Sequence, residues 1–302
     1  MTEAGGVLCL YKEASMTSHD AVNIVRRLYG TRQVGHTGTL DPDATGVLVI
    51  MVGRAVKAAE FLGSSQKEYT ATLRLGLTTS TEDTSGEVLS RYEGKLPDFE
   101  EVKKVCESFI GKGQQIPPMY SALKINGQKL VNLARKNKEI ERQPRQIEIY
   151  SLSVEPGERP GDYLLRTKVS AGTYIRTLCA DIGKKLGCGG VMASLERTAC
   201  GERFTVDKSV RFSLLEELDI QKREELLLPT EELFADLPIM HLPEFFERLC
   251  RSGQEIYQKK VGTNFADGSL VRIYGAHGFF AVGQAGEYEN GSAVKARKIF
   301  KL

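Results

Sequence analysis

A carboxylate set inside a glycine-punctuated loop is the first candidate for chemistry in this sequence. The loop, 35–46, reads GHTGTLDPDATG, and an apolar run, 47–52, follows it directly. Pro42 fixes its own φ and restricts Asp41 to extended conformations, while glycines permit backbone geometries or close approaches that a side chain blocks. An isolated Asp-Pro is typical of a turn before a buried strand, but the full string favours presentation of Asp41 to a ligand. The glycines in question are Gly35, Gly38 and Gly46.

An arginine at the start of an expected helix is the second candidate. The segment 170–178 reads SAGTYIRTL and places Arg176 shortly after an expected strand. If Arg176 pairs with Asp41, its charge fixes the orientation of the carboxylate and lowers the carboxyl pKa, so that a buried Asp41 stays ionised. The alternative is that Arg176 only bridges to a surface acid.

Two tyrosines, Tyr69 and Tyr174, lie in the neighbouring motifs KEY and TYIR. Each has two interpretations. A tyrosine packs in a core with its hydroxyl hydrogen-bonded, or its ring provides a platform on which a nucleobase stacks.

A basic segment, 115–145, is the candidate for contact with a phosphate backbone. From 124 onward it has seven Lys and Arg residues against Glu139 and Glu141, in a chain whose net charge is only +2. A solvated helix face is the alternative for such a run, so the accompanying motifs must decide. The basic residues are Lys124, Lys129, Arg135, Lys136, Lys138, Arg142 and Arg145.

The elements that position these residues mix helices and strands without a regular βαβ rhythm. Apolar spacing predicts a helix from Ser18, as N-cap, to Gly30, and alternation predicts a half-buried strand over 67–77. Further strands are expected over 146–154 and 163–169, with a helix over 174–186. We therefore predict an α+β fold around a largely antiparallel mixed sheet flanked by helices.

Prolines near residue 238 predict a boundary between two domains. We expect a catalytic domain over 1–238 and a small β-rich domain over 239–302, which has a short helix over 244–251 and strands over 268–274 and 279–282. A length of 302 residues suits one large and one small domain.

Composition narrows the class of protein. The sequence offers no stretch long enough to span a bilayer, and we expect a soluble cytoplasmic protein. Six cysteines without a Cys-x-x-Cys pair and four scattered histidines predict buried free thiols and no metal site.

Four segments, in order, resemble the bacterial tRNA pseudouridine-55 synthases, the TruB family. They are the loop 35–46, KEY at 67–69 with LG at 75–76, PPMYSALK at 117–124, and GTYIRTL at 172–178 running on to LERT at 195–198. The resemblance extends from residue 7 to about 204, and the C-terminal part resembles the family's small PUA-like RNA-binding domain only loosely. It implies the pseudouridine synthase fold and isomerisation of a uridine in the tRNA T loop with base flipping. No cofactor is required, the partner is the T stem-loop of tRNA, and we expect a monomer.

Residue by residue, the resemblance assigns roles. Asp41 matches the catalytic aspartate, Arg176 its partner, and Tyr69 the tyrosine that stacks on the target base. His36 matches the histidine that fills the gap left by flipped-out nucleotides, and Tyr174 and Leu195 line the base pocket. Segment 115–145 matches the thumb that grips the T loop, and its expected RNA contacts are Lys124, Arg135, Arg142 and Arg145.

One departure from the family pattern concerns a turn near the N-terminus. The family usually has Lys-Pro-x-Gly where this chain has Lys12-Glu13-Ala14-Ser15. Two other functions remain open at this stage: a non-catalytic RNA-binding tRNA folding chaperone, and the RNA-guided relative that works with a guide RNA and partner proteins. The thumb argues against the second, because that relative has no comparable insertion.

Overall fold

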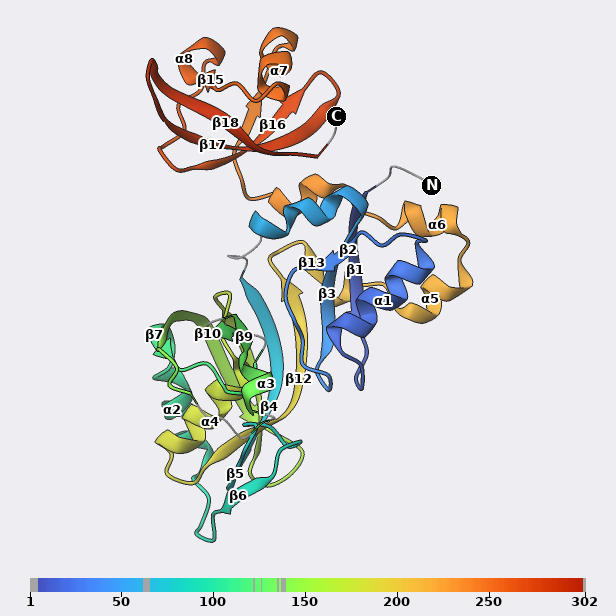
Figure 1. Cartoon of the computed structure of the whole chain (residues 1–302). Helices are drawn as coiled ribbons and strands as arrows, with labels where there is room; N and C mark the ends of the chain where they lie inside the picture. The colour runs from blue at the N-terminus through green and yellow to red at the C-terminus, as the bar shows by residue number, and fades with distance from the viewer. Residues whose placement is uncertain are drawn as a thin grey trace.

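The computed structural model describes residues 5–61, 66–121, 123–125, 127–134, 136 and 140–300. Within these residues nine strands form one long, twisted sheet (Figure 1). Seven of them follow one another in the order β1 (Gly6–Lys12), β3 (Thr45–Val52), β12 (Gly190–Cys200), β4 (Lys67–Leu75), β11 (Asp162–Val169), β10 (Arg145–Pro156) and β7 (Gly111–Gln115). In addition, β2 (Val34–His36) pairs with β3, and β13 (Phe204–Thr205) pairs with β12.

The sheet has one parallel junction among the described strands, between β3 and β12. It consists of only two pairs, Glu196 with Thr45 and Arg197 with Gly46, whereas the other pairings of this sheet are antiparallel. The junction joins the N-terminal part of the sheet to the part that contains β4, β10 and β11. The predicted α+β fold with a largely antiparallel mixed sheet is confirmed.

Helices cover the sheet in two separate groups. Helix α1 (Ser18–Leu28) packs with α5 (Phe212–Glu217) on the apolar side chains of β1 and β3. Helices α2 (Phe99–Glu107) and α4 (Ile175–Lys185) bury a second core against β4, β10 and β11. The remaining short elements are η1 (Gly53–Phe61), β5 (Leu77–Thr79), β6 (Val88–Arg91), η2 (Val206–Lys208), α6 (Ile220–Glu225) and η3 (Thr230–Phe234).

Two boundary predictions need correction. Thr17, not Ser18, caps α1: its hydroxyl accepts from Asp20 N–H at 3.0 Å, and the Asp20 carboxylate accepts from Thr17 N–H at 2.9 Å. The strand predicted over 67–77 ends at Leu75, because Gly76 turns the chain with φ +92°. The helix predicted over 174–186 is confirmed, since α4 lies between Tyr174 and Leu186 as its caps.

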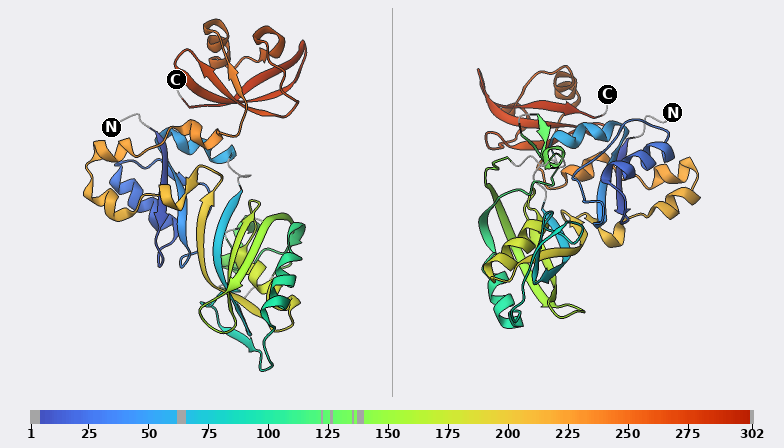
Figure 2. Two further views of the ribbon diagram at one scale, coloured as in Figure 1. Left: turned by 180° about the vertical axis from the view of Figure 1, so that it is seen from behind. Right: turned by 60° about the horizontal axis from the view of Figure 1, so that its bottom comes forward.

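The second sheet begins at Ile239 and occupies one end of the molecule in all three views of Figures 1 and 2. Its strands, in spatial order, are β14 (Ile239–His241), β16 (Leu270–Gly275), β17 (Gly278–Tyr288), β18 (Gly291–Ile299) and β15 (Ile256–Tyr257), accompanied by α7 (Glu244–Arg251) and α8 (Gln258–Val261). Phe279 and Phe300 from this part contact Phe234 of η3, with ring centroids 5.9 and 5.5 Å from it. A cluster of aromatic rings thus joins the second sheet to η3.

All six cysteines are buried and free, as expected. The described residues include no group of three or more histidine, cysteine or carboxylate side chains placed to hold a metal ion. Nor does the described part of the chain contain a helix with the length and apolar character needed to cross a lipid bilayer.

The turn that departs from the family pattern is strained. Ser15 is exposed and has φ +62°, a conformation that glycine adopts freely and other residues rarely adopt. Holding a non-glycine residue in this conformation destabilises the folded state by about 1–3 kcal/mol. Replacement by glycine removes this strain, but it also stabilises the unfolded state by about 0.4–1 kcal/mol, because glycine has the larger unfolded-state entropy.

Ser15→Gly should therefore raise the free energy of unfolding by about 1 kcal/mol, measured by urea denaturation. Ser15→Ala is the matched control, because it also removes the hydroxyl but keeps a Cβ, and it should bring no gain. Equal effects of the two substitutions would show that the backbone at Ser15 is not strained.

Candidate active site

A cavity of about 340 Å³ opens where the 35–46 loop, β4, β12 and the start of α4 meet. It brings together five residues that the sequence singled out: Asp41, Tyr69, Tyr174, Arg176 and Leu195. Its lining also includes Lys67, Ser121, Leu123, Ile175 and Arg197, together with residues 38–40 and 172–173. Residues more than 150 positions apart thus share one concave site, which is the usual form of a ligand pocket.

Asp41 and Arg176 form the predicted ion pair. Arg176 Nε lies 2.9 Å from Asp41 Oδ2, and Arg176 Nη2 donates to Asp41 Oδ1 at 3.4 Å. The arginine side chain is 6 % exposed, whereas the aspartate side chain is 37 % exposed. The two-point contact fixes the plane of the carboxylate and still leaves it accessible from the cavity.

The pKa of Asp41 differs from the sequence expectation. Burial raises this pKa above its usual value, and the Arg176 guanidinium opposes the rise without cancelling it. The negative charge of Asp83 adds to the rise. The expectation that the arginine sets the net direction is therefore wrong, because the cost of burying the charge exceeds the benefit of the pair.

Asp83 is a site residue that the sequence reasoning missed. Its Oδ2 lies 3.4 Å from Arg176 Nη1, so that the guanidinium stands between two carboxylates. Arg176 also donates to the carbonyls of Thr81, at 3.0 Å, and Tyr120, at 2.7 Å. The sequence signal that could have pointed to Asp83 is an acidic residue in a turn-rich stretch after a strand. In the structure Asp83 does stabilise a turn, because its Oδ1 accepts a hydrogen bond from the Ser85 N–H at 3.0 Å.

Two buried side chains from the N-terminal segment hold the loop on either side of Asp41. Ser18 Oγ accepts from Leu40 N–H at 2.8 Å and donates to Leu40 C=O at 3.0 Å. Lys12 is fully buried, and burial lowers its pKa to about 8. Its ammonium donates to three carbonyls at 2.8–2.9 Å, those of Glu13, Met16 and Pro42. The position of Asp41 thus depends on residues outside its own loop.

Among the three loop glycines, only Gly46 is sterically required. Its φ is +100°, and a Cβ there would lie 2.2 Å from the Arg197 carbonyl oxygen. A Cβ at Gly35 or Gly38 would meet nothing nearer than 3.5 Å. The expectation that all three glycines serve close approaches or unusual geometry is therefore corrected to Gly46 alone.

The two tyrosines occupy different environments. Tyr69 is buried, and burial raises the pKa of its hydroxyl, which is hydrogen-bonded to the Arg197 guanidinium. Tyr174 is half-buried and caps α4, with its backbone held by the side chain of Gln115. Gln115 Nε2 donates to Tyr174 C=O at 3.0 Å, and Gln115 Oε1 accepts from Tyr174 N–H at 2.8 Å.

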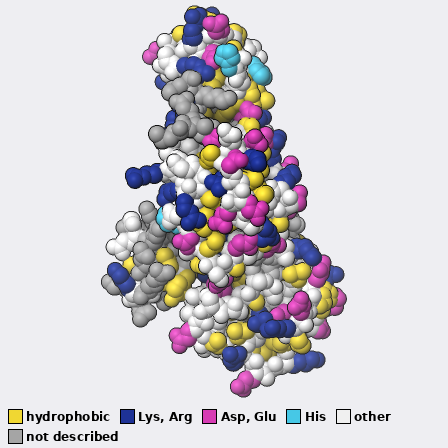
Figure 3. Space-filling view, turned by 90° about the vertical axis from the view of Figure 1, so that its right-hand side faces the viewer, with side chains coloured by type: hydrophobic (Ala, Val, Ile, Leu, Met, Phe, Trp, Pro, Cys, Tyr) yellow, Lys and Arg dark blue, Asp and Glu magenta, His cyan; other side chains and the backbone are white. Residues whose placement is uncertain are grey.

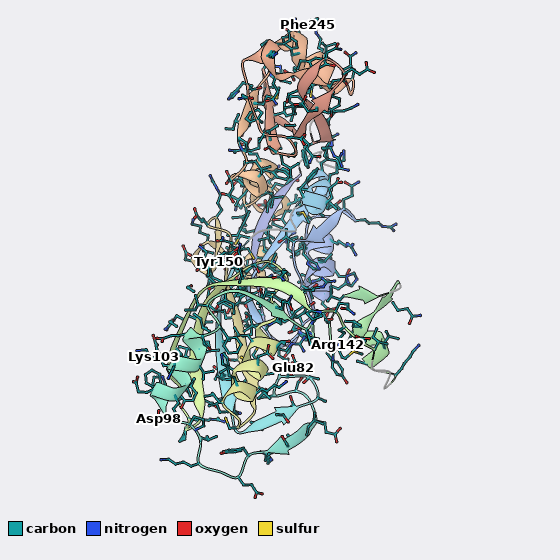
Figure 4. All side chains as sticks on the ribbon, turned by 90° about the vertical axis from the view of Figure 1, so that its left-hand side faces the viewer. Glu82, Asp98, Lys103, Arg142, Tyr150 and Phe245 are labelled. Atoms are coloured by element: carbon teal, nitrogen blue, oxygen red, sulfur yellow. The ribbon has the colours of Figure 1, made fainter. Side chains whose placement is uncertain are left out.

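The other predicted contacts lie outside the cavity lining. His36, on β2, accepts from the Gly38 N–H at 3.2 Å through Nδ1, and burial followed by the Arg197 charge lowers its pKa. Arg142 donates to Pro117 C=O at 3.0 Å and lies near Glu82 (Figure 4). Arg145, at the start of β10, is exposed.

The thumb is described only in part. Its described elements are β8 (Lys124–Ile125), β9 (Gln128–Lys129) and α3 (Leu130–Ala134), which project from the body of the molecule in Figure 4. Arg135 and the side chain of Lys124 lie outside the described residues. Their predicted RNA contacts therefore stay predictions.

Comparison with known proteins identifies the family. Residues 26–175 match the TruB family pseudouridylate synthase N-terminal domain, and residues 176–235 match the tRNA pseudouridylate synthase B C-terminal domain. The chain belongs to the TruB family. The boundary between the two family models lies just before Arg176, so the two residues of the ion pair fall in different models. In this structure both regions contribute strands to the same sheet and residues to the same cavity.

Relatives in the TruB family match nearly the whole chain. The tRNA pseudouridine synthase B of Clostridium tetani is 40% identical over 92% of this chain and 95% of its own length. That of Syntrophotalea carbinolica is 38% identical over 98% and 96%. Among solved structures, a chain of a Cbf5-Nop10-Gar1 complex matches with a TM-score of 0.76 and 26% identity, covering 98% of this chain and 85% of that one.

The electrostatics of the site predict how Asp83 affects Asp41. Asp83→Asn removes a negative charge that disfavours ionisation of Asp41, so the Asp41 pKa should fall. Arg176→Met removes the opposing positive charge, so the Asp41 pKa should rise further. Titration of the carboxyl carbon of Asp41 by carbon-13 NMR measures both changes. Asp181→Asn on α4 is the control and should leave the pKa of Asp41 unchanged. A shift of similar size in the Asp181→Asn variant would indicate a general effect of charge and not a specific effect of Asp83.

Proposed function

We propose that this protein isomerises uridine to pseudouridine in tRNA, at position 55 of the T loop. The observation that carries the proposal is the Asp41–Arg176 pair at a cavity that Tyr69 also lines. The family membership and the similarity to proteins named tRNA pseudouridine synthase B support the reaction and the class of substrate. The T loop and position 55 rest on the motif resemblance.

The reaction exchanges one bond to the ribose for another. The bond from C1′ to N1 of uracil breaks, a bond from C1′ to C5 forms, C5 loses its proton and N1 gains one. No oxidation or reduction occurs, so the chemistry requires a carboxylate at the sugar and a cavity that holds the detached base and excludes water. Asp41 acts either as a nucleophile at C1′ or in proton transfer, and both roles require its ionised form at some stage.

Arg176 holds that carboxylate in place during either route. Its contacts with Asp83 and with the carbonyls of Thr81 and Tyr120 restrict the guanidinium, so Asp41 is presented in one orientation. Tyr69 offers its ring to stack on the uracil, and Tyr174 and Leu195 form the walls around it.

A base in a folded RNA loop reaches such a cavity only after extrusion. Unstacking costs on the order of a few kcal/mol, which protein contacts must offset. We assign this role to His36, which would fill the gap in the RNA loop, and to thumb cations that contact phosphates. The face of the molecule in Figure 3 mixes acidic and basic side chains, in keeping with a net charge of +2. RNA binding therefore depends on local groups of cations and not on the overall charge.

An RNA-guided mode would need further components. Activity of the purified chain alone on an unmodified tRNA transcript is the expected result for the stand-alone enzyme. Activity only after addition of a guide RNA and partner proteins would favour the guided mode, and RNA binding without pseudouridine would favour the chaperone.

Asp41→Asn should abolish turnover and retain tRNA binding, because the amide keeps the size of the side chain but carries no charge. Release of tritium from tRNA labelled at uracil C5 measures the reaction, since C5 loses its hydrogen when it bonds to C1′. Asp43→Asn is the matched control: the same change two residues away, at an exposed carboxylate, should leave release close to that of the wild type. Substantial tritium release by the Asp41 variant would remove Asp41 from its role.

Thumb cations should contribute to the salt dependence of tRNA binding. Arg142→Ala and Arg145→Ala should each weaken binding and reduce the slope of log affinity against log salt by about 0.7–0.9 per lost phosphate contact. Lys103→Ala on α2, which lies on the other side of the molecule from the thumb in Figure 4, serves as the control. An unchanged slope in both thumb variants would place the RNA-binding surface elsewhere.

A further inference from the structure

Besides the Asp41–Arg176 pair, the cavity contains two cations for which the reaction gives no role. Lys67 is the first residue of β4, and Arg197 lies on β12. Both charged groups approach Gly38: Lys67 Nζ lies 3.6 Å, and Arg197 Nη1 3.7 Å, from the point where a Cβ on Gly38 would stand. The absence of a side chain at Gly38 thus leaves room beside two neighbouring positive charges.

Among the described residues, neither cation has a carboxylate partner. Arg197 is 1 % exposed, and within the described residues it donates to neutral groups, among them Val47 C=O at 2.7 Å and Gly38 C=O at 3.2 Å. Lys67 Nζ has no hydrogen-bond partner among the described residues, and no described carboxylate forms an ion pair with either side chain. Arg176, in the same cavity, contacts two carboxylates.

The acids next to these cations in the sequence are directed elsewhere. Glu68 pairs with Lys168 at 3.4 Å, and Glu196 accepts a hydrogen bond from the Tyr11 hydroxyl at 2.8 Å. Successive side chains of a strand point to opposite faces, so neither acid turns toward the cavity without a change of register. Within the described residues, the protein itself thus leaves the two positive charges uncompensated.

Uncompensated charge in a partly buried site is costly. Burial and the neighbouring Arg197 lower the pKa of Lys67, so its ammonium is disfavoured by its protein surroundings. An anion that enters with the ligand would remove this cost. Lys67 would then gain both a partner and a higher pKa.

We propose that Lys67 and Arg197 form a phosphate subsite, in which Lys67 Nζ binds a phosphodiester oxygen next to the target nucleotide and Arg197 supplies buried positive charge behind it. The inference rests on the proposed function, because that function brings an RNA strand to the cavity. A phosphodiester is the anionic group that every nucleotide of such a strand carries, and a lysine binds it as a point charge without demanding one orientation. The subsite would anchor the backbone while the base enters between Tyr69 and Tyr174.

The first part of the test uses variants of Lys67 that separate the effect of its charge from the effect of its size. Lys67→Met should weaken binding of an unmodified T stem-loop RNA about 10-fold or more at low salt and reduce the salt slope by about 0.7. Lys67→Arg keeps the charge and should keep the slope. Lys103→Met, an identical substitution on α2, should change neither quantity. Loss of binding in Lys67→Met with an unchanged salt slope would overturn the proposal, because it would indicate a loss of packing and not of a phosphate contact.

The RNA arm identifies the phosphate and does not depend on the folding of a variant. In each RNA, one phosphodiester on the 5′ or the 3′ side of the target uridine is replaced by a neutral methylphosphonate next to a 2′-deoxy sugar. Its affinity is compared with that of an RNA that carries the same 2′-deoxy sugar and an ordinary phosphodiester. At one of the two positions, the methylphosphonate should lower the affinity of the wild type by the same factor as Lys67→Met lowers it for the ordinary RNA. Lys67→Met should then bind the methylphosphonate RNA no more weakly than the ordinary RNA. Additive losses at both positions would overturn the subsite.

The two hypotheses fail in different ways. Absence of pseudouridine in the unmodified T stem-loop RNA after incubation with wild type would refute the proposed function, whereas the binding cycle requires no turnover and decides the subsite by itself. Normal turnover combined with additive binding losses would refute the subsite alone.

Discussion

Gly46 and Arg197 approach each other so closely that no side chain fits at Gly46, and the architecture of the site depends on this contact. It is one of the two residue pairs that join β3 to β12, and so it connects the N-terminal part of the sheet to the rest. The 35–46 loop ends at the junction, and the Arg197 side chain reaches back to Gly38 and Tyr69. A wider junction would separate the loop that presents Asp41 from the strands and helix that contribute Tyr69 and Arg176.

Charge in the cavity is balanced unevenly. Arg176 contacts two carboxylates, while Lys67 and Arg197 have only neutral oxygens or no partner among the described residues. Burial raises the pKa of Asp41 and lowers that of Lys67, so burial disfavours the charged forms of both groups. The phosphate of a nucleotide would relieve this condition at Lys67, because it supplies the negative charge that this ammonium lacks.

The thumb and the Asp41–Arg176 pair share contacts at the base of the thumb. Gln115 holds the backbone of Tyr174, two residues before Arg176, and the carbonyl of Tyr120 accepts a hydrogen bond from Arg176. Movement of the thumb would therefore reach the ion pair through two hydrogen-bonded connections. Buried Lys12 and Ser18 hold the other side of the pair by fixing the backbone around Asp41, so each partner is restrained independently.

The sequence by itself determined the elements and the identity of the main site residues. Alternation placed β4, apolar spacing and Gly187 placed α4, and the motifs singled out Asp41, Tyr69 and Arg176, because these signals depend on near neighbours in the chain. It missed Asp83, Lys12 and the role of Ser18, and it gave the wrong direction for the pKa of Asp41. Those properties were decided by tertiary structure alone, since burial and contacts between residues 22 to 135 positions apart set them, and no local pattern records how deeply a charge is buried.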